Sequence, residues 1–290
     1  MKILCATDLQ PRASAIIGRA SWLARKLQGR LTVLHVVPPE EPRGLALEQR
    51  VWRADSHLRA RVSDEDGKPQ VRVRVGNPAR RVVEAITESG ADLVVLGPRS
   101  VPGEAPLFQR GMAERVLDET RRPVLVVRNE PQFEYGRVMI ALDLSEESAG
   151  ALALTESLAF AGEEIACAVH AYHPPYEGML ASVGVGTDKI DSHAEAWRRD
   201  FATGVREFLR RHSKDPWRYR LIMAEDRPVR GILAVTEQVQ PDLLVVGTRT
   251  QGALLRTLLG SVGRDVADSA SCDVLLVPPR AAGPAEGTAA

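Results

Sequence analysis

The sequence predicts an α/β protein made of two tandem, doubly wound domains. One observation is an internal repeat, since Asp8 and Asp143 each follow an apolar run and lie 135 residues apart. A second is that Gly97 and Gly247 end similar stretches that lie 150 residues apart. A third is that short runs rich in β-branched residues alternate with segments of helical periodicity. The two constant offsets indicate one duplicated unit, with about fifteen residues added in the second copy between its second and third strands.

The first strand and helix are the clearest elements of each copy. Residues 3–7 form an apolar run that predicts a strand. Apolar residues then recur at helical spacing over residues 13–27, so a helix with one apolar stripe follows. Pro11 suits the first turn of this helix, where its missing N–H costs nothing. A similar strand and helix start recur from Val138 in the second copy.

The later strands are short, and several are apolar on both faces. Such runs are typical of parallel strands that helices cover on both sides. Each copy therefore reads β-α-β-α-β-α-β-α-β, a five-stranded parallel sheet flanked by helices. In the first copy these strands are predicted at residues 31–37, 71–75, 92–97 and 124–127.

Composition shifts along the chain predict where the copies begin and end. We expect a first domain at residues 1–133 and a second domain at residues 134–280. Residues 128–136 contain proline, glycine and charged side chains, which is typical of a linker. Residues 281–290 are small and poor in apolar side chains, so a disordered tail is expected.

Charge and cysteine content argue against several classes of function. Lys+Arg and Asp+Glu both total 38, so no basic field recommends a nucleic-acid partner. No apolar run reaches transmembrane length, and the N-terminus lacks the apolar segment of a signal peptide. Cys5, Cys167 and Cys272 are odd in number and far apart, as in proteins of a reducing compartment. We therefore expect a cytoplasmic protein without a membrane partner.

A ligand site is expected at the carboxyl ends of the strands, where the strand order reverses. Residues 247–261 run from a strand through a glycine-spaced loop to a helix that opens at Ser261. The free N–H groups of a helix start attract anions, and Arg249, Arg256 and Arg264 lie nearby in the sequence. The alternative is that Gly260 and Ser261 form only a turn and a helix cap.

These motifs resemble those of the universal stress protein family in its tandem two-domain form. The resemblance covers nearly all of residues 1–280 and rests on "ATDL", "ALDLS", "DLLVVG" and "GTRTQGALLRTLLGSV". It implies the sheet order 3-2-1-4-5 in each domain. It also implies an ATP site in which Gly-x-x-Gly, nine residues and Gly-Ser/Thr hold the phosphates and ribose. In that family the aspartate after strand one and the backbone of strand two hold the adenine.

The second copy matches this pattern at three of its four positions, Gly247, Gly260 and Ser261. Thr250 replaces the second glycine. A β-branched residue is a poor substitute where positive φ or close approach to phosphate is needed, but its hydroxyl can donate to a phosphate oxygen. The resemblance implies a cofactor site for ATP built from Ala141, Leu142, Asp143, Ala171, Val246, Gly247, Arg249, Thr250, Gly260, Ser261, Val262 and Gly263.

The first copy departs further from the pattern and is expected to bind no ATP. Ten residues separate Ser100 from Gly111, where the family has nine. Pro98 lacks an N–H donor, and Met112 has no hydroxyl. We expect this degenerate copy to pack on the second copy through the fifth strands, because an open apolar edge strand invites association.

The aspartates and histidines have structural as well as functional interpretations. Helix capping is favoured for Asp8, whereas capping and an adenine contact are equally supported for Asp143. His35 and His170 lie in strands and are interpreted as histidines with satisfied hydrogen bonds. A zinc site formed by His170, His173 and His193 lacks a compact ligand spacing, so no metal is expected.

The sequence lacks the motifs of the common hydrolases and metalloproteases. There is no Gly-x-Ser-x-Gly, no His-Glu-x-x-His and no neighbouring Cys/His pair. The leading hypothesis is a non-enzymatic ATP-binding stress-response protein, with at most weak ATP hydrolysis and a possible homodimeric state. The alternative is a nucleotide-free scaffold that acts through self-association or partner binding.

Overall fold

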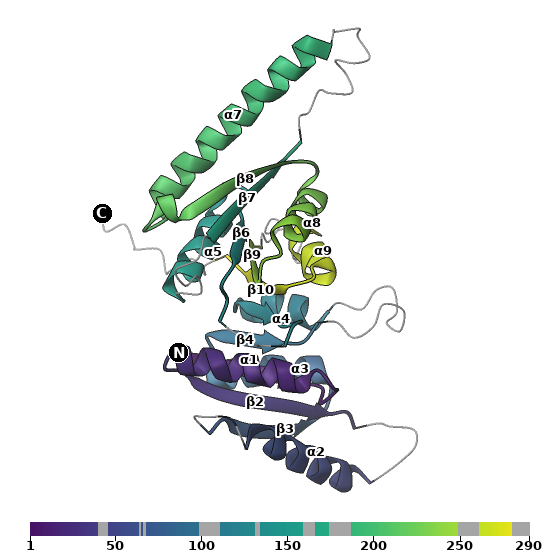
Figure 1. The fold of residues 1–290 in the computed structure, drawn as a ribbon. Helices are drawn as coiled ribbons and strands as arrows, with labels where there is room; N and C mark the ends of the chain where they lie inside the picture. The colour runs from purple at the N-terminus through teal and green to yellow at the C-terminus, as the bar shows by residue number, and fades with distance from the viewer. Residues whose placement is uncertain are drawn as a thin grey trace, which may run out of the picture.

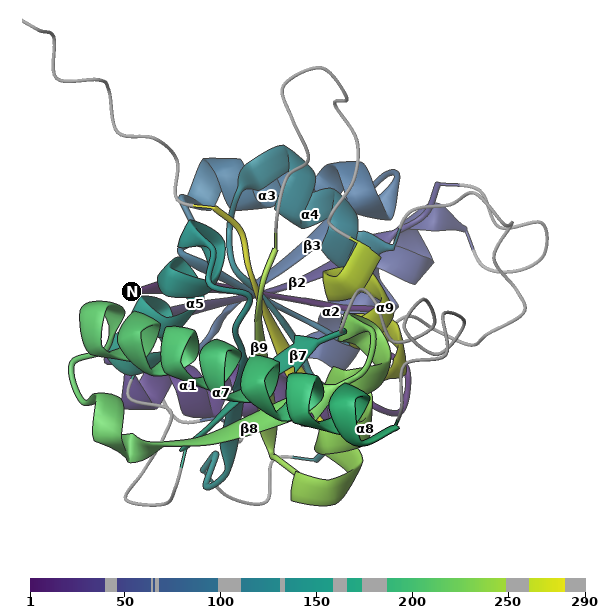
Figure 2. The ribbon, with the colours of Figure 1, turned by 90° about the horizontal axis from the view of Figure 1, so that it is seen from above.

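The chain forms one continuous ten-stranded sheet in the order β3-β2-β1-β4-β5-β10-β9-β6-β7-β8 (Figure 1). Seen from above, the strands fan out around a common centre, as the twist of a large sheet requires (Figure 2). The computed structural model describes residues 1–39, 46–63, 65, 68–98, 111–130, 134–158, 166–173, 187–248 and 261–279. The tail predicted to be disordered, residues 281–290, lies outside these ranges.

The first copy has the predicted strand order 3-2-1-4-5, and its strands are parallel. Its first helix begins two residues after Pro11, because a turn comes first, closed by the bond from Ala13 N to Gln10 O. The placement of Pro11 within the helix was therefore wrong. The elements are β1 (Lys2–Thr7), α1 (Ala13–Lys26), β2 (Arg30–Val37), α2 (Leu47–Val62), β3 (Gln70–Val75), α3 (Pro78–Ser89), β4 (Leu93–Leu96), α4 (Met112–Thr120) and β5 (Val124–Val126).

The second copy repeats this order as β8-β7-β6-β9-β10, again with parallel strands. The added residues fall between its second and third strands, as predicted, where α7 has 26 residues and α2 has 16. Figure 1 shows α7 as a long rod that reaches past the end of the sheet. The elements are β6 (Val138–Ala141), α5 (Glu146–Ser157), β7 (Ala166–Tyr172), α7 (Thr187–His212), η1 (Pro216–Arg218), β8 (Tyr219–Glu225), α8 (Pro228–Val239), β9 (Leu243–Gly247), α9 (Ser261–Ser269) and β10 (Asp273–Val277).

The two copies meet through their fifth strands, which confirms the predicted contact. β5 and β10 pair antiparallel, and Leu125 lies opposite Leu275 at the centre of the register. These two leucines hold equivalent positions in the repeat, so a pseudo-twofold axis passes between them. Because the edges hydrogen-bond to each other, the two predicted parallel sheets merge into one mixed sheet.

Helices cover both faces of the sheet and bury one core on each. Ile16 of α1, Leu152 of α5 and Val205 of α7 pack on one face. The α3, α4, α8 and α9 helices pack on the other, where Val116 and Val266 are fully buried. Consecutive residues of a strand point to opposite faces, so the strands are apolar on both sides.

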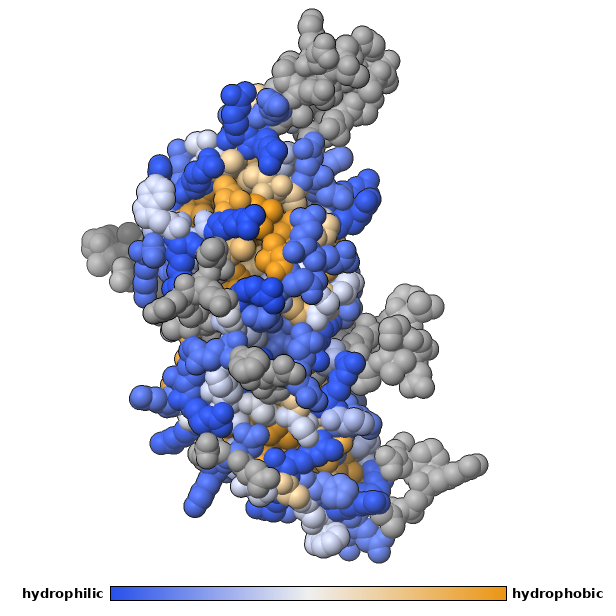
Figure 3. Space-filling view, in the orientation of Figure 1, coloured by the Kyte–Doolittle hydropathy of each residue, from blue (hydrophilic) through white to orange (hydrophobic). Residues whose placement is uncertain are grey.

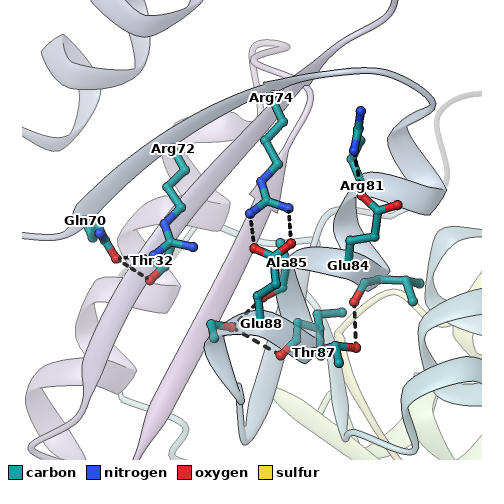
Figure 4. A network of polar contacts seen from close by, with 12 residues as sticks. Thr32, Gln70, Arg72, Arg74, Arg81, Glu84, Ala85, Thr87 and Glu88 are labelled. Atoms are coloured by element: carbon teal, nitrogen blue, oxygen red, sulfur yellow. Dashed lines mark hydrogen bonds and ion pairs between the residues drawn. The ribbon is translucent and has the colours of Figure 1, made fainter.

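The outer edge of the first copy is charged rather than apolar (Figure 4). Arg74 on β3 pairs with Glu88 of α3, and Arg81 Nη1 donates to Glu84 Oε2 at 2.8 Å. The hydrogen bond from Arg74 lowers the pKa of Glu88, so the carboxylate stays ionised. Charge on an edge strand disfavours the addition of a further strand. The outer edge at β3 is thus unlike the centre of the sheet, where the apolar strands β5 and β10 pair.

One buried carboxylate ties the predicted linker to the junction. Asp273 is 1% exposed, and its Oδ1 accepts hydrogen bonds from Arg128 N at 2.8 Å and Asn129 N at 3.1 Å. Its Oδ2 accepts from Tyr135 Oη at 2.8 Å and lies 3.5 Å from Arg19 Nε. The Arg19 guanidinium stacks over the Tyr135 ring at 4.1 Å. The two described ends of the linker are therefore anchored, rather than loose.

We predict that Asp273→Asn lowers the free energy of unfolding by about 3 kcal/mol, because it leaves Arg19 buried without its counter-charge. The amide nitrogen of asparagine would also face N–H donors that now bind a carboxylate. Urea denaturation of the full chain measures the change. The matched control is Asp268→Asn, at an exposed position of α9. Equal stabilities of the two variants would contradict the role of Asp273.

Candidate functional site

The candidate site lies where the strand order reverses around β6. Ala141, at the end of β6, pairs with Val169 on β7 and with Val246 on β9. This register places Asp143, just beyond β6, and Gly247, the last residue of β9, at the same edge of the sheet. The sequence prediction that the two motifs converge at the carboxyl ends of the strands is consistent with this arrangement.

Asp143 stabilises a turn and does not cap the following helix. Its Oδ1 accepts a hydrogen bond from Ser145 N at 3.1 Å and another from Ser145 Oγ. The N-cap of α5 is Ser145, whose Oγ accepts from Ser148 N at 3.2 Å. The capping interpretation of Asp143 is therefore wrong. Its carboxylate lies exposed at the edge of the sheet.

Asp8 behaves in the same way in the first copy. Its Oδ1 accepts from Gln10 N at 3.0 Å, and Arg12 stands at the N-cap of α1. The physical reason is shared, since Leu9 and Leu144 both have φ near 61° and turn the chain before the helix begins. The capping interpretation of Asp8 is also wrong.

The strand histidines fix the loop that follows each first strand. His35 Nδ1 lies 2.8 Å from Thr7 O, and His170 Nδ1 lies 2.7 Å from Leu142 O. A carbonyl oxygen only accepts, so Nδ1 carries the proton and donates in both cases. These bonds confirm that both histidines are satisfied. Among the residues that the structure describes, no three His, Cys, Asp or Glu side chains gather in a way that would hold a metal ion.

Gly247 is required by packing. A Cβ added there would lie 2.7 Å from Glu147 O and 2.9 Å from Ser148 N, in the first turn of α5. At Gly97, the equivalent position, an added Cβ would meet only the side chain of Ile16, with Cδ1 at 2.7 Å and Cγ1 at 3.7 Å. The sequence motif therefore includes one glycine whose absence of a side chain already serves the fold.

Thr248 fixes the chain where it leaves β9. Its N and its Oγ1 donate to Val277 O at 2.8 and 3.2 Å, and the residue is 3% exposed. Sequence reasoning overlooked this residue, although a Thr after the motif glycine is visible in the sequence. The first copy has Pro98 here, which can make neither bond.

The residues expected around an adenine are apolar, and their side chains belong to the two cores on either face of the sheet. Ala141, Leu142 and Val246 are between 3% and 9% exposed. Ala171 and Val262 are half-buried and pack against the core beneath α8 and α9. Figure 3 shows hydrophobic side chains gathered on one side of the second copy, with a smaller hydrophobic area on the first.

The phosphate-facing part of the predicted site is described only from its helix onward. Ser261 is the first residue of α9, and Gly263 is buried in its first turn. The remaining predicted residues, Arg249, Thr250 and Gly260, lie outside the described ranges, as does Arg256.

Arg264 is engaged across the junction. Its Nε lies 3.2 Å from Glu114 Oε1, on α4 of the first copy, and 3.9 Å from Asp265 Oδ1. Sequence reasoning had assigned Arg264 to a bound anion and had not considered Glu114. The repeat offset of 150 residues makes the two positions equivalent, and this was the signal that could have paired them.

The cysteines offer no nucleophile near the site. All three are buried and free, and burial raises the pKa of Cys5 to about 12 and that of Cys272 to about 11. At neutral pH these thiols stay protonated, so they pack as small apolar groups.

Comparison with known proteins gives one family across both copies. The family model described as "Universal stress protein family" matches residues 1–128 and 134–278. A universal stress protein of Mycolicibacterium smegmatis is 24% identical over 297 residues, covering 96% of this chain and 97% of that protein. One of Thermus aquaticus is 30% identical over 138 residues, covering 43% of this chain and 97% of that protein.

A solved structure has the same fold over nearly the whole chain. The universal stress protein from Archaeoglobus fulgidus superposes with a TM-score of 0.65 at 16% identity and covers 96% of both chains. Across the described part of the chain, none of the helices has the length and apolar character needed to cross a membrane.

The packing of Gly247 gives a prediction that needs no ligand. Gly247→Ala should lower the free energy of unfolding by about 2 kcal/mol, because the added methyl group overlaps the backbone of α5. Gly97→Ala should cost less than about 1 kcal/mol, because the end of a flexible isoleucine can move aside. Thermal denaturation of both variants measures the difference, and a larger loss for Gly97→Ala would contradict the assignment.

Proposed function

The chain belongs to the universal stress protein family, and on that basis we propose that it is a non-enzymatic, ATP-binding stress-response protein. A single nucleotide site lies in the second copy, residues 134–280, and the first copy serves as its structural partner. The observation that carries the proposal is the register of Ala141 with Val246, because it brings Asp143 and Gly247 to one edge of the sheet.

The start of α9 supplies the phosphate subsite of the proposal. Phosphates would lie against the backbone N–H groups of Gly260, Ser261 and Val262, where a helix begins and its dipole favours negative charge. Arg249 and Thr250 precede this turn and would add a guanidinium and a hydroxyl donor.

The adenine subsite of the proposal uses the ends of the strands. Ala171 is half-buried and would offer apolar contact for the ring, while Ala141, Leu142 and Val246 are buried in the cores that support these strand ends. The exposed carboxylate of Asp143 would accept a hydrogen bond from the amino group of the base. Fixation of the loop by His170 holds that carboxylate at the edge of the sheet.

The first copy binds no nucleotide in this proposal. The stretch between Ser100 and Gly111 is one residue longer than its counterpart in the second copy, and α4 begins at Met112, which has no hydroxyl. Too few donors remain to offset the desolvation of a triphosphate. Binding without more than weak hydrolysis, a cytoplasmic location and a homodimeric state belong to the same proposal.

A nucleotide-free scaffold is the second candidate, and two exposed side chains favour it. Trp52 on α2 is 72% exposed and Trp217 in η1 is 81% exposed. Large aromatic residues contribute strongly to protein interfaces when they become buried there. In this case the protein would act by binding other proteins through its exposed surfaces, and not by binding a nucleotide at the strand ends.

We predict that Gly260→Asp lowers ATP affinity at least tenfold, roughly 1.4 kcal/mol, because it adds bulk and negative charge where phosphate binds. The matched control is Gly111→Asp at the start of α4, where an added Cβ meets no atom within 4 Å. The control should bind ATP like the wild type. Titration calorimetry measures both, with circular dichroism as the check on folding.

The outcomes separate the two candidates. Loss of affinity in Gly260→Asp alone supports the nucleotide site in the second copy. Equal affinities of the wild type and Gly260→Asp, or no binding by the wild type at millimolar ATP, would leave the scaffold as the better account.

A further inference from the structure

We infer that the junction between the copies is a selective recognition surface, so that the first copy pairs with a second copy and not with another first copy. The pseudo-twofold axis between Leu125 and Leu275 brings equivalent positions face to face. In a pair of identical copies, each residue close to this axis would face the same residue of the other copy. The charged positions of this junction instead carry different residues in the two copies.

The first such position is Glu114 in α4 and Arg264 in α9. They lie at the repeat offset of 150 residues, like the buried pair Val116 and Val266 on the same helices. Glu114 is 8% exposed and its Oε1 lies 3.2 Å from Arg264 Nε. Two first copies would place Glu114 against Glu114, and two second copies would place Arg264 against Arg264. Like charges juxtaposed across an interface oppose association.

The second position is the buried carboxylate of Asp273. At the same offset the first copy has Pro123, which carries no charge. Its counter-charge Arg19 is 5% exposed, and the second copy has Leu154 at the position equivalent to Arg19, at the offset of 135 residues.

Only the mixed pair therefore satisfies both buried charges. A pair of second copies would bury Asp273 opposite Leu154, and a pair of first copies would place Arg19 opposite Pro123, so the Arg19–Asp273 ion pair would be lost in both. Removing one member of a buried ion pair is strongly destabilising. The Asp273 and Glu114 contacts lie on opposite faces of the β5–β10 strand pair, because Arg19 belongs to α1 and Glu114 to α4. Two independent contacts thus impose the same choice of partner.

The partner that fits the junction surface of the first copy is the second copy, residues 134–280, of the same chain or of another chain. Within one chain the linker keeps the correct partner close, so the intramolecular pair dominates. The apolar strands β5 and β10 provide the buried surface at the junction. The charged residues determine which copy can pair with which.

A charge-swap cycle in the full chain tests this inference, with hydrogen exchange of the β5 and β10 amides as the readout. Glu114→Arg and Arg264→Glu each create a like-charge pair and should raise the opening constant at the junction about tenfold. The double variant restores an opposite pair and should return to within about threefold of the wild type. The hydrogen-exchange rates of amides in β2 and β7, which lie away from the junction, should change little in all three variants.

The control cycle uses Arg115 and Glu119, a pair within α4 whose Nε–Oε1 distance is 3.1 Å and whose side chains are both more than 40% exposed. Reversing the charges of this pair should leave the hydrogen-exchange rates of the β5 and β10 amides unchanged. The inference is overturned if the Glu114/Arg264 double variant opens as readily as either single variant, or if the control cycle shows the same recovery. Should a reversal prevent folding, Glu114→Gln and Arg264→Gln form a neutral cycle with the same readout. None of these outcomes depends on whether the chain binds ATP.

Discussion

The antiparallel pairing of β5 with β10 is the constraint on which the rest of the structure depends. Each copy ends its sheet in an apolar strand whose outer backbone groups need partners. Pairing Leu125 with Leu275 satisfies both edges at once and joins ten strands into one sheet. It also brings α4 against α9 and places Asp273 beneath the linker. The contacts between the copies, including those made by Glu114 and Asp273, follow from this one register.

Duplication within one chain explains why equivalent positions now differ. A copy that always meets the other copy can keep a residue that would be harmful if it met itself. Asp273 is stable only because Arg19, Tyr135 and the linker amides surround it. The copies also differ at the strand ends, where Thr248 holds the chain in one copy and Pro98 stands at the equivalent position of the other.

Much of the fold was predictable because it depends on local pattern. The repeat offsets and β-branched runs predicted the strands and the place of the insertion at α7, and the resemblance to the family implied the order of the strands in each sheet. The residues at which α1 and α5 begin were not predictable, because they depend on the positive φ of Leu9 and Leu144, which leucine seldom adopts. The role of Asp273 was hidden as well, since its partners are distant in sequence. At the candidate site, the motif identified Gly247 but not the reason that α5 leaves no space for a side chain there.

In the proposed arrangement, the first copy completes the sheet and the second copy binds one nucleotide. The decisive measurement is the number of ATP molecules bound per full-length chain, determined by titration calorimetry of protein from which any bound nucleotide has been removed. We expect a stoichiometry close to one. A value close to two would mean that the first copy also binds, and the absence of binding would mean that neither does; either result would contradict the proposed arrangement.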